Sequence, residues 1–317
     1  VQPDGKILGC GVVATSNAGS QHFGALFRFL PDGGVDTSFN HTGYVQDDYG
    51  NQVTNLMHRV FLDDQGRITV MVKGGDRMGL VRYLPNGALD VSYGVNGRAL
   101  VDVGYMPYWE NATAIRHADG SFTLAGQIGS SDWAATIPSY LGLVRINAQG
   151  APVSSFGVDG VLALPTYRLD GAAGGAPTGS RGMDMVELSD GRFVVAYARF
   201  GMGGSTTESA LVLAAFNADG TVAADFGTNG LYEYPGANLT GSGIHRLADD
   251  RLLFFHATHS NNGPGAILCV TPQGQLDATF GVGGLQQIPY PDGPQLDYVN
   301  LLDGSLLDDG SILAYGT

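Results

Sequence analysis

Apolar residues along the chain occur in short runs, and each run is bounded by a turn that contains glycine. Typical runs are residues 68–72, 79–83 and 193–197. Short runs rich in β-branched and aromatic residues are typical of strands. No stretch keeps a 3.6-residue apolar period over three turns, which would be the pattern of an amphipathic helix. The pattern therefore predicts an all-β chain with almost no helix.

Two kinds of tight turn return at regular intervals. The first, of Asp-Gly type, lies at residues 5, 66, 120, 191, 250 and 310, so the intervals are 61, 54, 71, 59 and 60 residues. The second carries a glycine at 33, 87, 150, 220 and 274. Asp-Gly and Asn-Gly pairs supply the positive φ that tight hairpins need. Two hairpins per interval predict a repeat of about 60 residues with four antiparallel strands.

An aromatic residue follows each second turn, and a glycine stands four positions after it. A single four-stranded sheet would expose two edges and two apolar faces, so such units are stable only when they stack. We therefore expect one β-propeller domain over residues 1–317, with the aromatic residues packed between neighbouring blades. About 21 strands are expected, which favours five blades over the alternative of six. The aromatic residues are Phe39, Tyr93, Phe156, Phe226 and Phe280.

Three motifs recur in fixed order and resemble the bacterial delta-60 repeat family. They are residues 2–8 (QPDGKIL), 82–87 (RYLPNG) and 276–281 (LDATFG). The fourth and fifth repeats lack the arginine of the second motif and carry Ala215 and Cys269 there, and the fifth has Asp250 for the turn glycine. The resemblance implies a propeller-like fold and a secreted or surface protein of bacteria. It implies no particular activity.

Composition narrows the classes of partner. The chain has 16 basic and 30 acidic residues, a net charge of −14, which repels phosphate backbones and argues against nucleic-acid binding. No run of 18 apolar residues exists, so no membrane-spanning helix is expected. The two cysteines, Cys10 and Cys269, have no metal-ligand spacing, and we expect buried free thiols. No initiating methionine or signal peptide is present, which suggests a processed or trimmed chain.

The irregular connections should all lie on the face opposite the Asp-Gly turns, where recognition usually takes place. Nine of the 14 tyrosines, Tyr49 among them, and both tryptophans fall in or beside these connections. Aromatic rings suit sugar faces and protein partners. The predicted ligand-binding residues are Tyr108, Trp109, Trp133, Tyr234 and Tyr298.

Carboxylates accompany these rings. Asp48, Glu110, Asp184 and Asp297 could converge at the mouth of a central channel. Converging carboxylates could hydrolyse a glycosidic bond or bind calcium, although a chain of this charge also carries solvated acidic residues everywhere. No cofactor is expected, with calcium as the alternative. No nucleophile elbow, HExxH motif or Walker loop is present.

Three functions follow from these features. The favoured one is a secreted or surface, non-catalytic propeller that binds a glycan or a protein partner through its loop-rich face. The alternative is a hydrolase, with or without a metal, that uses the four carboxylates. The third is a structural segment of a longer surface protein or assembly.

Overall fold

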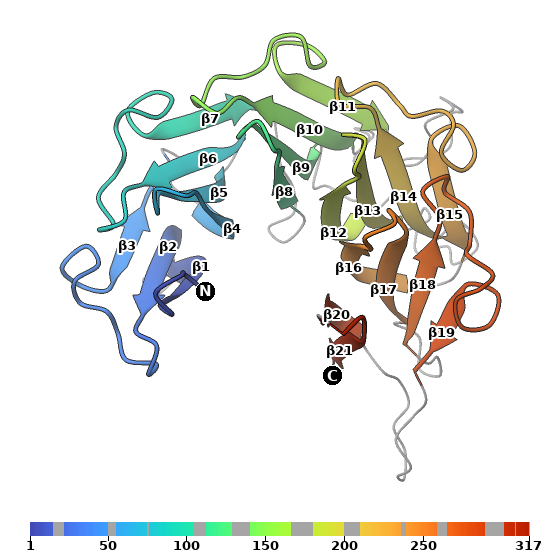
Figure 1. Ribbon diagram of the computed structural model, residues 1–317. Helices are drawn as coiled ribbons and strands as arrows, with labels where there is room; N and C mark the ends of the chain where they lie inside the picture. Colours follow the sequence, from blue (N-terminus) through green and yellow to red (C-terminus); the bar gives the residue numbers. More distant parts are fainter. Residues whose placement is uncertain are drawn as a thin grey trace. The chain divides into compact units, whose positions relative to one another are not determined.

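The computed structural model describes an all-β protein (Figure 1). The described residues are 1–14, 22–49, 55–74, 76–103, 112–128, 140–165, 180–199, 210–235, 239–258, 265–288, 301–307 and 309–316, and they contain 21 strands and no helix. No membrane-spanning helix is therefore found in this part of the chain. The chain divides into two compact units, Val1–Gly129 with Gly142–Leu162 and Ser130–Leu141 with Ala163–Thr317.

The strands form six antiparallel sheets in chain order. The first three sheets are β1–β3, β4–β7 and β8–β11. Their strands are β1 (Ile7–Ala14), β2 (His22–Phe29), β3 (Tyr44–Asp47), β4 (Asn55–Leu62), β5 (Ile68–Gly74), β6 (Arg77–Tyr83), β7 (Arg98–Asp102), β8 (Ala112–Arg116), β9 (Phe122–Ile128), β10 (Tyr140–Ile146) and β11 (Val161–Pro165).

The last three sheets are β12–β15, β16–β19 and β20–β21. Their strands are β12 (Ser180–Glu187), β13 (Phe193–Arg199), β14 (Ala210–Phe216), β15 (Leu231–Pro235), β16 (Leu239–Arg246), β17 (Leu252–Thr258), β18 (Ala266–Val270), β19 (Leu285–Gln287), β20 (Leu301–Leu306) and β21 (Ile312–Gly316).

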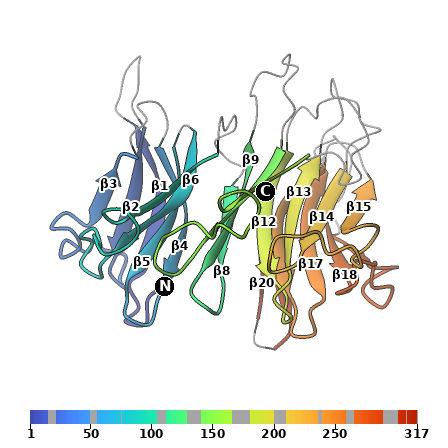
Figure 2. The same cartoon turned by 90° about the horizontal axis from the view of Figure 1, so that it is seen from above.

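Four of the six sheets have the predicted four antiparallel strands in sequential order, and Figure 2 shows β4, β5 and β6 side by side. Turns of the Asp-Gly series join β4 to β5, β8 to β9, β12 to β13, β16 to β17 and β20 to β21, as predicted. The first sheet has three strands because it starts after such a turn, and the last has two. The choice between five and six blades stays a prediction.

The turn series has the backbone geometry that the sequence predicts. The turn glycines have positive φ, for example 82° at Gly5 and 73° at Gly66. In the fifth repeat Asp250 takes the glycine position with a φ of 65°. Aspartate is among the few side chains that tolerate this left-handed region. Asp250 is also held in place, because its carboxylate accepts hydrogen bonds from the Ser189 backbone and hydroxyl and from Arg246.

The motif aromatics pack against the next repeat, as expected. Phe39 is fully buried, and a Cβ on Gly87 of the following turn would lie 3.0 Å from its ring. The backbone N–H of Asn40 also donates to the Asn86 carbonyl at 2.8 Å. Equivalent contacts link Tyr93 with Gly150 and Phe226 with Gly274, and Phe156 is buried as well. Phe280 differs, because it is only partly buried.

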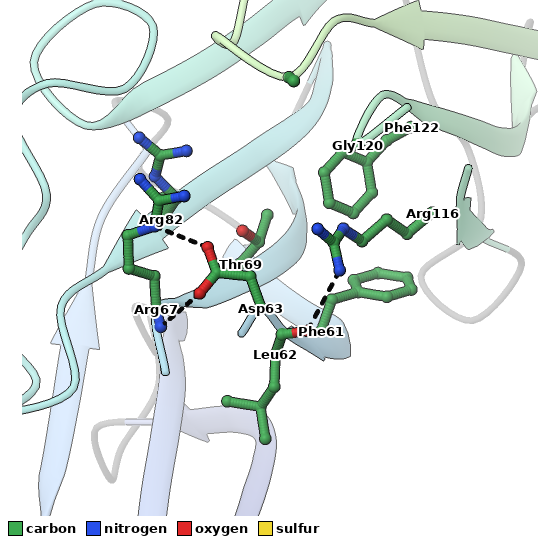
Figure 3. A pocket seen from close by; sticks show the side chains of 10 residues that line it. Phe61, Leu62, Asp63, Arg67, Thr69, Arg82, Arg116, Gly120 and Phe122 are labelled. Atoms are coloured by element: carbon green, nitrogen blue, oxygen red, sulfur yellow. Dashed lines mark hydrogen bonds and ion pairs between the residues drawn. The ribbon is translucent and has the colours of Figure 1, made fainter. Parts of the chain in front are cut away.

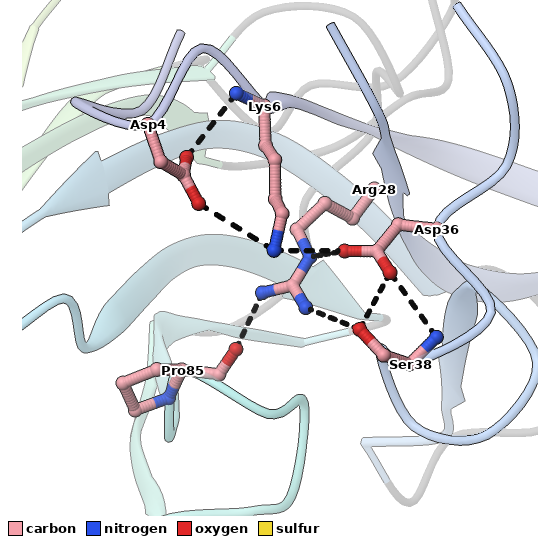
Figure 4. Close-up of polar contacts among 6 residues, drawn as sticks. All are labelled: Asp4, Lys6, Arg28, Asp36, Ser38 and Pro85. Carbon is pink, nitrogen blue, oxygen red and sulfur yellow. Dashed lines mark hydrogen bonds and ion pairs between the residues drawn. The ribbon is translucent and has the colours of Figure 1, made fainter.

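A buried ionic network explains the Arg and Asp of the repeat motifs (Figure 4). In the first repeat the Arg28 Nε donates to Asp36 at 2.8 Å, and Arg28 Nη1 donates to the Pro85 carbonyl of the next repeat at 2.5 Å. Lys6 lies 3.3 Å from the same carboxylate. The Ser38 hydroxyl, assisted by the charges of Lys6 and Arg28, lowers the pKa of Asp36 to about 2. The network ties the turn, the third strand and the neighbouring sheet together.

The residues of the network differ from repeat to repeat. In the second repeat Arg82 pairs with Asp90 at 2.7 Å. The fourth repeat has Ala215 and Ala223 at these two positions, both fully buried, so both charges are absent. In the fifth repeat Cys269 replaces the arginine, and Arg251 pairs with Asp277 at 2.7 Å instead. The third repeat keeps Arg145 but has Val153 at the second position, and Arg145 donates to Thr123 at 2.8 Å. A buried charge without a partner is costly, and each charge that remains in the third and fifth repeats has another partner.

The two cysteines are free thiols. Cys269 is buried, as predicted, whereas Cys10 is only partly buried because β1 lies at the edge of its sheet. Burial raises the pKa of both thiols to about 11. Neither thiol is therefore a reactive thiolate at neutral pH.

His58 lies at an irregularity of β4, where the pairing with β5 shifts between Met57 and Arg59. Its Nε2 is buried and has no hydrogen-bond partner in the part of the chain that the structure describes. Burial, with the nearby charge of Lys73, lowers the pKa of His58 to about 4. The histidine is therefore neutral in the folded protein at pH 7.

This histidine should make the fold acid-sensitive. Because its pKa is lower folded than unfolded, the unfolded state takes up the proton first as the pH falls below about 6.5. We expect His58 to contribute a loss of about 2 kcal/mol in unfolding free energy between pH 7 and pH 4.5. Urea denaturation at both pH values should show a smaller loss for His58→Gln than for the wild type. An equal loss in both proteins would contradict the assignment.

Candidate functional site

In each sheet, the two ends of the strands carry different kinds of connection. Because successive strands are antiparallel, the Asp-Gly turns and the second turns lie at one end, and the remaining connections leave from the other. Asp48, Asp184 and Tyr234 lie within the described residues. The others fall outside the described residues: Tyr108, Trp109, Glu110, Trp133, Asp297 and Tyr298.

Asp48 follows β3 and is engaged with the start of β4. Its Oδ1 accepts a hydrogen bond from Asn55 Nδ2 at 3.2 Å. Asn55 is 2% exposed; it also donates to the His22 carbonyl at 3.0 Å and accepts the Tyr49 N–H at 3.2 Å. Asp48 thus helps to fix the two ends of the connection between the first and second sheets.

Tyr49, expected on the loop-rich face, is instead buried, with 3% exposure. Its ring lies where a Cβ on Gly24 would be, so the glycine in β2 makes room for it. The Tyr49 hydroxyl has no hydrogen-bond partner among the described residues, and burial raises its pKa well above the usual value. The sequence offers one signal for this packing, a glycine inside a strand, which often marks a close approach.

Beside Tyr49, a polar cluster joins the first and second sheets. Asp47 accepts a hydrogen bond from the Tyr83 hydroxyl at 2.9 Å and pairs with Arg98 at 2.5 Å. Tyr83 is 1% exposed, and burial raises the pKa of its hydroxyl. These contacts satisfy buried polar groups and support the connection that contains Asp48.

Asp184 in β12 binds backbone groups. Its Oδ1 accepts the Met185 N–H at 2.9 Å, and its Oδ2 accepts the Ile244 N–H of β16 at 3.4 Å. Asp303 stands at the same position of the next repeat but one, seven residues before the turn glycine. It accepts His245 Nε2 at 2.8 Å and packs against Gly243, where a Cβ would overlap the carboxylate. These carboxylates connect neighbouring first strands.

The carboxylate hypothesis therefore rests on residues with structural partners and on residues beyond the described part. Asp48 and Asp184 each accept hydrogen bonds from the protein. Among the described residues, no group of three or more His, Cys, Asp or Glu side chains could hold a metal ion. Convergence of the four carboxylates stays a prediction.

Tyr234 is partly buried. It lies in β15 opposite Leu211 and packs against the core cluster of the fourth and fifth sheets. Its ring therefore contributes to the packing of the sheet, and its role in ligand binding stays a prediction.

The comparisons with known proteins concern the fold. Residues 2–39 and 66–93 match a family model described as a domain of unknown function (DUF5122) beta-propeller. No curated protein matches the chain.

Similar solved structures share little sequence with the chain. A protein of unknown function from Dyadobacter fermentans is 11% identical, with a TM-score of 0.49, over 99% of this chain and 91% of that one. An ulvan lyase of polysaccharide lyase family PL25 is 10% identical, with a TM-score of 0.46, over 86% of this chain. The match spans 66% of the lyase. A PQQ-bound aldose sugar dehydrogenase from Streptomyces coelicolor is 11% identical, with a TM-score of 0.45, over 96% of this chain and 90% of the dehydrogenase.

At these values the neighbours carry no argument about activity. The four-stranded antiparallel sheets and the matched repeat motifs agree on the architecture. The chain thus has an all-β propeller fold of four-stranded antiparallel sheets, and two of its stretches match the DUF5122 beta-propeller domain.

Proposed function

We propose that this chain is a non-catalytic propeller of a secreted or surface protein, and that it binds a glycan or a protein partner. The binding surface is the sheet end opposite the Asp-Gly turns. The resemblance of the repeats to the delta-60 family supports the location. The propeller fold by itself implies neither the ligand nor the location, and both are part of the proposal.

The distribution of aromatic residues carries the proposal. The motif aromatics of the first four repeats are buried, with exposures of 0 to 2%. Both tryptophans of the chain, Trp109 and Trp133, stand in the sequence between β7 and β8 and between β9 and β10, outside the described residues. Neither belongs to the repeat motifs, and aromatic rings are common anchors of sugar and protein ligands.

The described carboxylates support binding over hydrolysis. Asp48 and Asp184 hold backbone and amide groups of neighbouring strands, which is a structural use of a carboxylate. A hydrolase would require Glu110 and Asp297 to supply the chemistry. A purely structural segment would bind no glycan, so substitution of the aromatic or the acidic residues would have no effect on binding.

Tryptophan fluorescence tests the proposal directly, because both tryptophans lie in these connections. The probes are xylohexaose, cellohexaose and maltohexaose, which are uncharged and are not repelled by a chain of charge −14. We expect one of them to change the emission. Trp109→Ala or Trp133→Ala should weaken binding about tenfold, as expected for an aromatic anchor. Val282→Ser, at a residue 88% exposed, serves as the control.

The same assay separates the alternatives. Glu110→Gln should leave binding within about twofold if the aromatic surface acts alone. Turnover of an oligosaccharide that is lost in Glu110→Gln, or in EDTA and restored by calcium, would replace the proposal with the hydrolase. Binding that persists in the Trp109→Ala/Trp133→Ala double variant, or no response to any of the three sugars, would overturn the glycan-binding surface.

A further inference from the structure

A small cavity lies between the second and third sheets, at the end that carries the Asp-Gly turns (Figure 3). One wall is a row of side chains across the second sheet, Phe61, Thr69 and Arg82, which are direct register partners. The opposite wall is the register pair Arg116 and Phe122 of the third sheet. The volume is about 60 Å³, which holds a few waters or one small anion.

The interior of the cavity is basic. Arg67, Arg82 and Arg116 line it, and Asp63 is the acidic residue among its lining residues. Even with Asp90, which pairs with Arg82, the cluster has three arginines and two aspartates. Arginine stays charged in proteins, so the cluster carries a net charge of +1 in a chain of −14.

Arg82 has unused donors that face this space. The residue is 8% exposed, its Nε donates to Asp90 at 2.7 Å, and its guanidinium lies 4.3 Å from the centroid of the Tyr93 ring. Within the described part of the chain, no residue accepts a hydrogen bond from its terminal nitrogens. Thr69 is 7% exposed, and its hydroxyl has no described partner either. Both residues line the cavity, so these donors can bind a ligand or water that enters it.

The neighbouring repeats show how these groups are normally satisfied. In the first repeat, Arg28 donates to the Pro85 carbonyl and to Ser38 (Figure 4). In the third repeat, Arg145 Nη1 donates to Thr123 at 2.8 Å, and Thr123 also bonds His117 at 2.7 Å. The second repeat makes neither arrangement. Its terminal guanidinium nitrogens and its threonine hydroxyl are both left for another partner.

Asp63 explains why the second repeat is different. The equivalent positions, three residues before the turn glycine or its replacement, are Gln2, His117, Leu188, Leu247 and Leu307. Asp63 draws Arg67 back onto itself, with Nε 2.6 Å from Oδ2, whereas Lys6 of the first repeat reaches Asp36. Arg116 donates weakly to the Leu62 carbonyl at 3.4 Å and otherwise has no described partner.

We propose that this cavity is a binding site for a tetrahedral oxyanion, phosphate or sulfate, held by Arg82, Arg116 and the Thr69 hydroxyl. Arginine and hydroxyl donors are the groups that recognise such anions, and charge-assisted hydrogen bonds to them are strong. The anion can be free or can be an ester on a larger molecule. The site lies at the opposite end of the sheets from the proposed glycan surface and does not depend on it.

Calorimetric titration with inorganic phosphate and with inorganic sulfate at low ionic strength tests the site. We expect saturable 1:1 binding, and Arg116→Met, at an exposed position, should weaken it about tenfold. Thr69→Val removes the hydroxyl with little change of shape and should weaken binding about threefold. Arg77→Met is the matched control, because it removes the same charge from the far end of β6 and should leave affinity unchanged.

The outcomes are distinct. Glucose 6-sulfate that binds more tightly than sulfate would assign the site to an esterified anion, and weaker binding would assign it to the free ion. Absence of saturable binding by the folded wild type would overturn the site. Equal weakening by Arg77→Met and Arg116→Met would also overturn it, because it would show only general attraction of anions to arginine.

Discussion

Replacing Asp36 by alanine should destabilise the first repeat by about 3–5 kcal/mol, because it leaves the charge of Arg28 buried without its partner. Arg28 is 5% exposed, and its Nε donates to Asp36 at 2.8 Å. The substitution also removes the acceptor of the Ser38 N–H at 3.1 Å. Urea denaturation should therefore show an early transition or a lower midpoint.

The fourth repeat shows how the loss can be reduced. It carries Ala215 and Ala223 in place of the pair, and Arg192, at the position of Lys6, bonds Asp190 of its own turn at 2.7 Å. The double variant Arg28→Ala/Asp36→Ala copies this arrangement and leaves Lys6 with Asp4, 3.4 Å away. We expect the double variant to be more stable than Asp36→Ala by about 1–2 kcal/mol.

Asp4→Ala is the control for charge alone, since the Asp4 side chain is 55% exposed and its removal should change the midpoint little. A double variant that is as unstable as the sum of the two single variants would contradict the coupling. It would show that the two residues contribute separately, through packing and turn formation.

The fold could be predicted because the residues that form tight turns recur at the same positions in each repeat. Glycine at 5, 66, 120, 191 and 310 needs no tertiary information to be assigned to a tight turn, and each has positive φ. The aromatic residues were assigned to the packing between sheets because isolated sheets would expose them. Phe280 was the exception, because it is only partly buried; the core cluster against which it packs is shared with the last sheet, which has only two strands.

The role of the ion pair between Arg28 and Asp36 could not be predicted from any one repeat. Arg28 and Asp36 are eight residues apart and meet through strand register. A comparison of repeats gives a mixed signal, since the fourth repeat replaces both residues, by Ala215 and Ala223, whereas the third keeps Arg145 and has Val153 at the second position. Register was also needed for Asp184, predicted as a rim carboxylate, which accepts an N–H from β16.

The basic cavity was missed for the opposite reason, because it results from a departure from the repeat. Asp63 in place of an apolar or neutral residue is the only sequence sign of it. Its effect on Arg67, and the unused donors of Arg82, depend on side-chain geometry that the repeat pattern does not fix.

The second large effect on stability is expected at Gly79, a strand glycine with no space for a side chain. Gly79 in β6 lies between β5 and β7, and a Cβ there would overlap the Ala99 carbonyl oxygen and lie 2.8 Å from the Leu100 Cα. Both contacts are backbone atoms of a paired strand, so neither can move aside without loss of the β6–β7 pairing. We expect Gly79→Ala to cost about 3 kcal/mol or more.

Gly9→Ala in β1 is the matched control, because nothing lies within 4 Å of the added Cβ and the backbone is not in the left-handed region. Both substitutions reduce the freedom of the unfolded chain equally, which by itself stabilises a strand by about 0.5–1 kcal/mol. Gly9→Ala should therefore raise the thermal midpoint slightly while Gly79→Ala lowers it. Similar midpoints for the two variants would mean that β7 can shift away from β6, and that this fourth strand is held less tightly than its register implies.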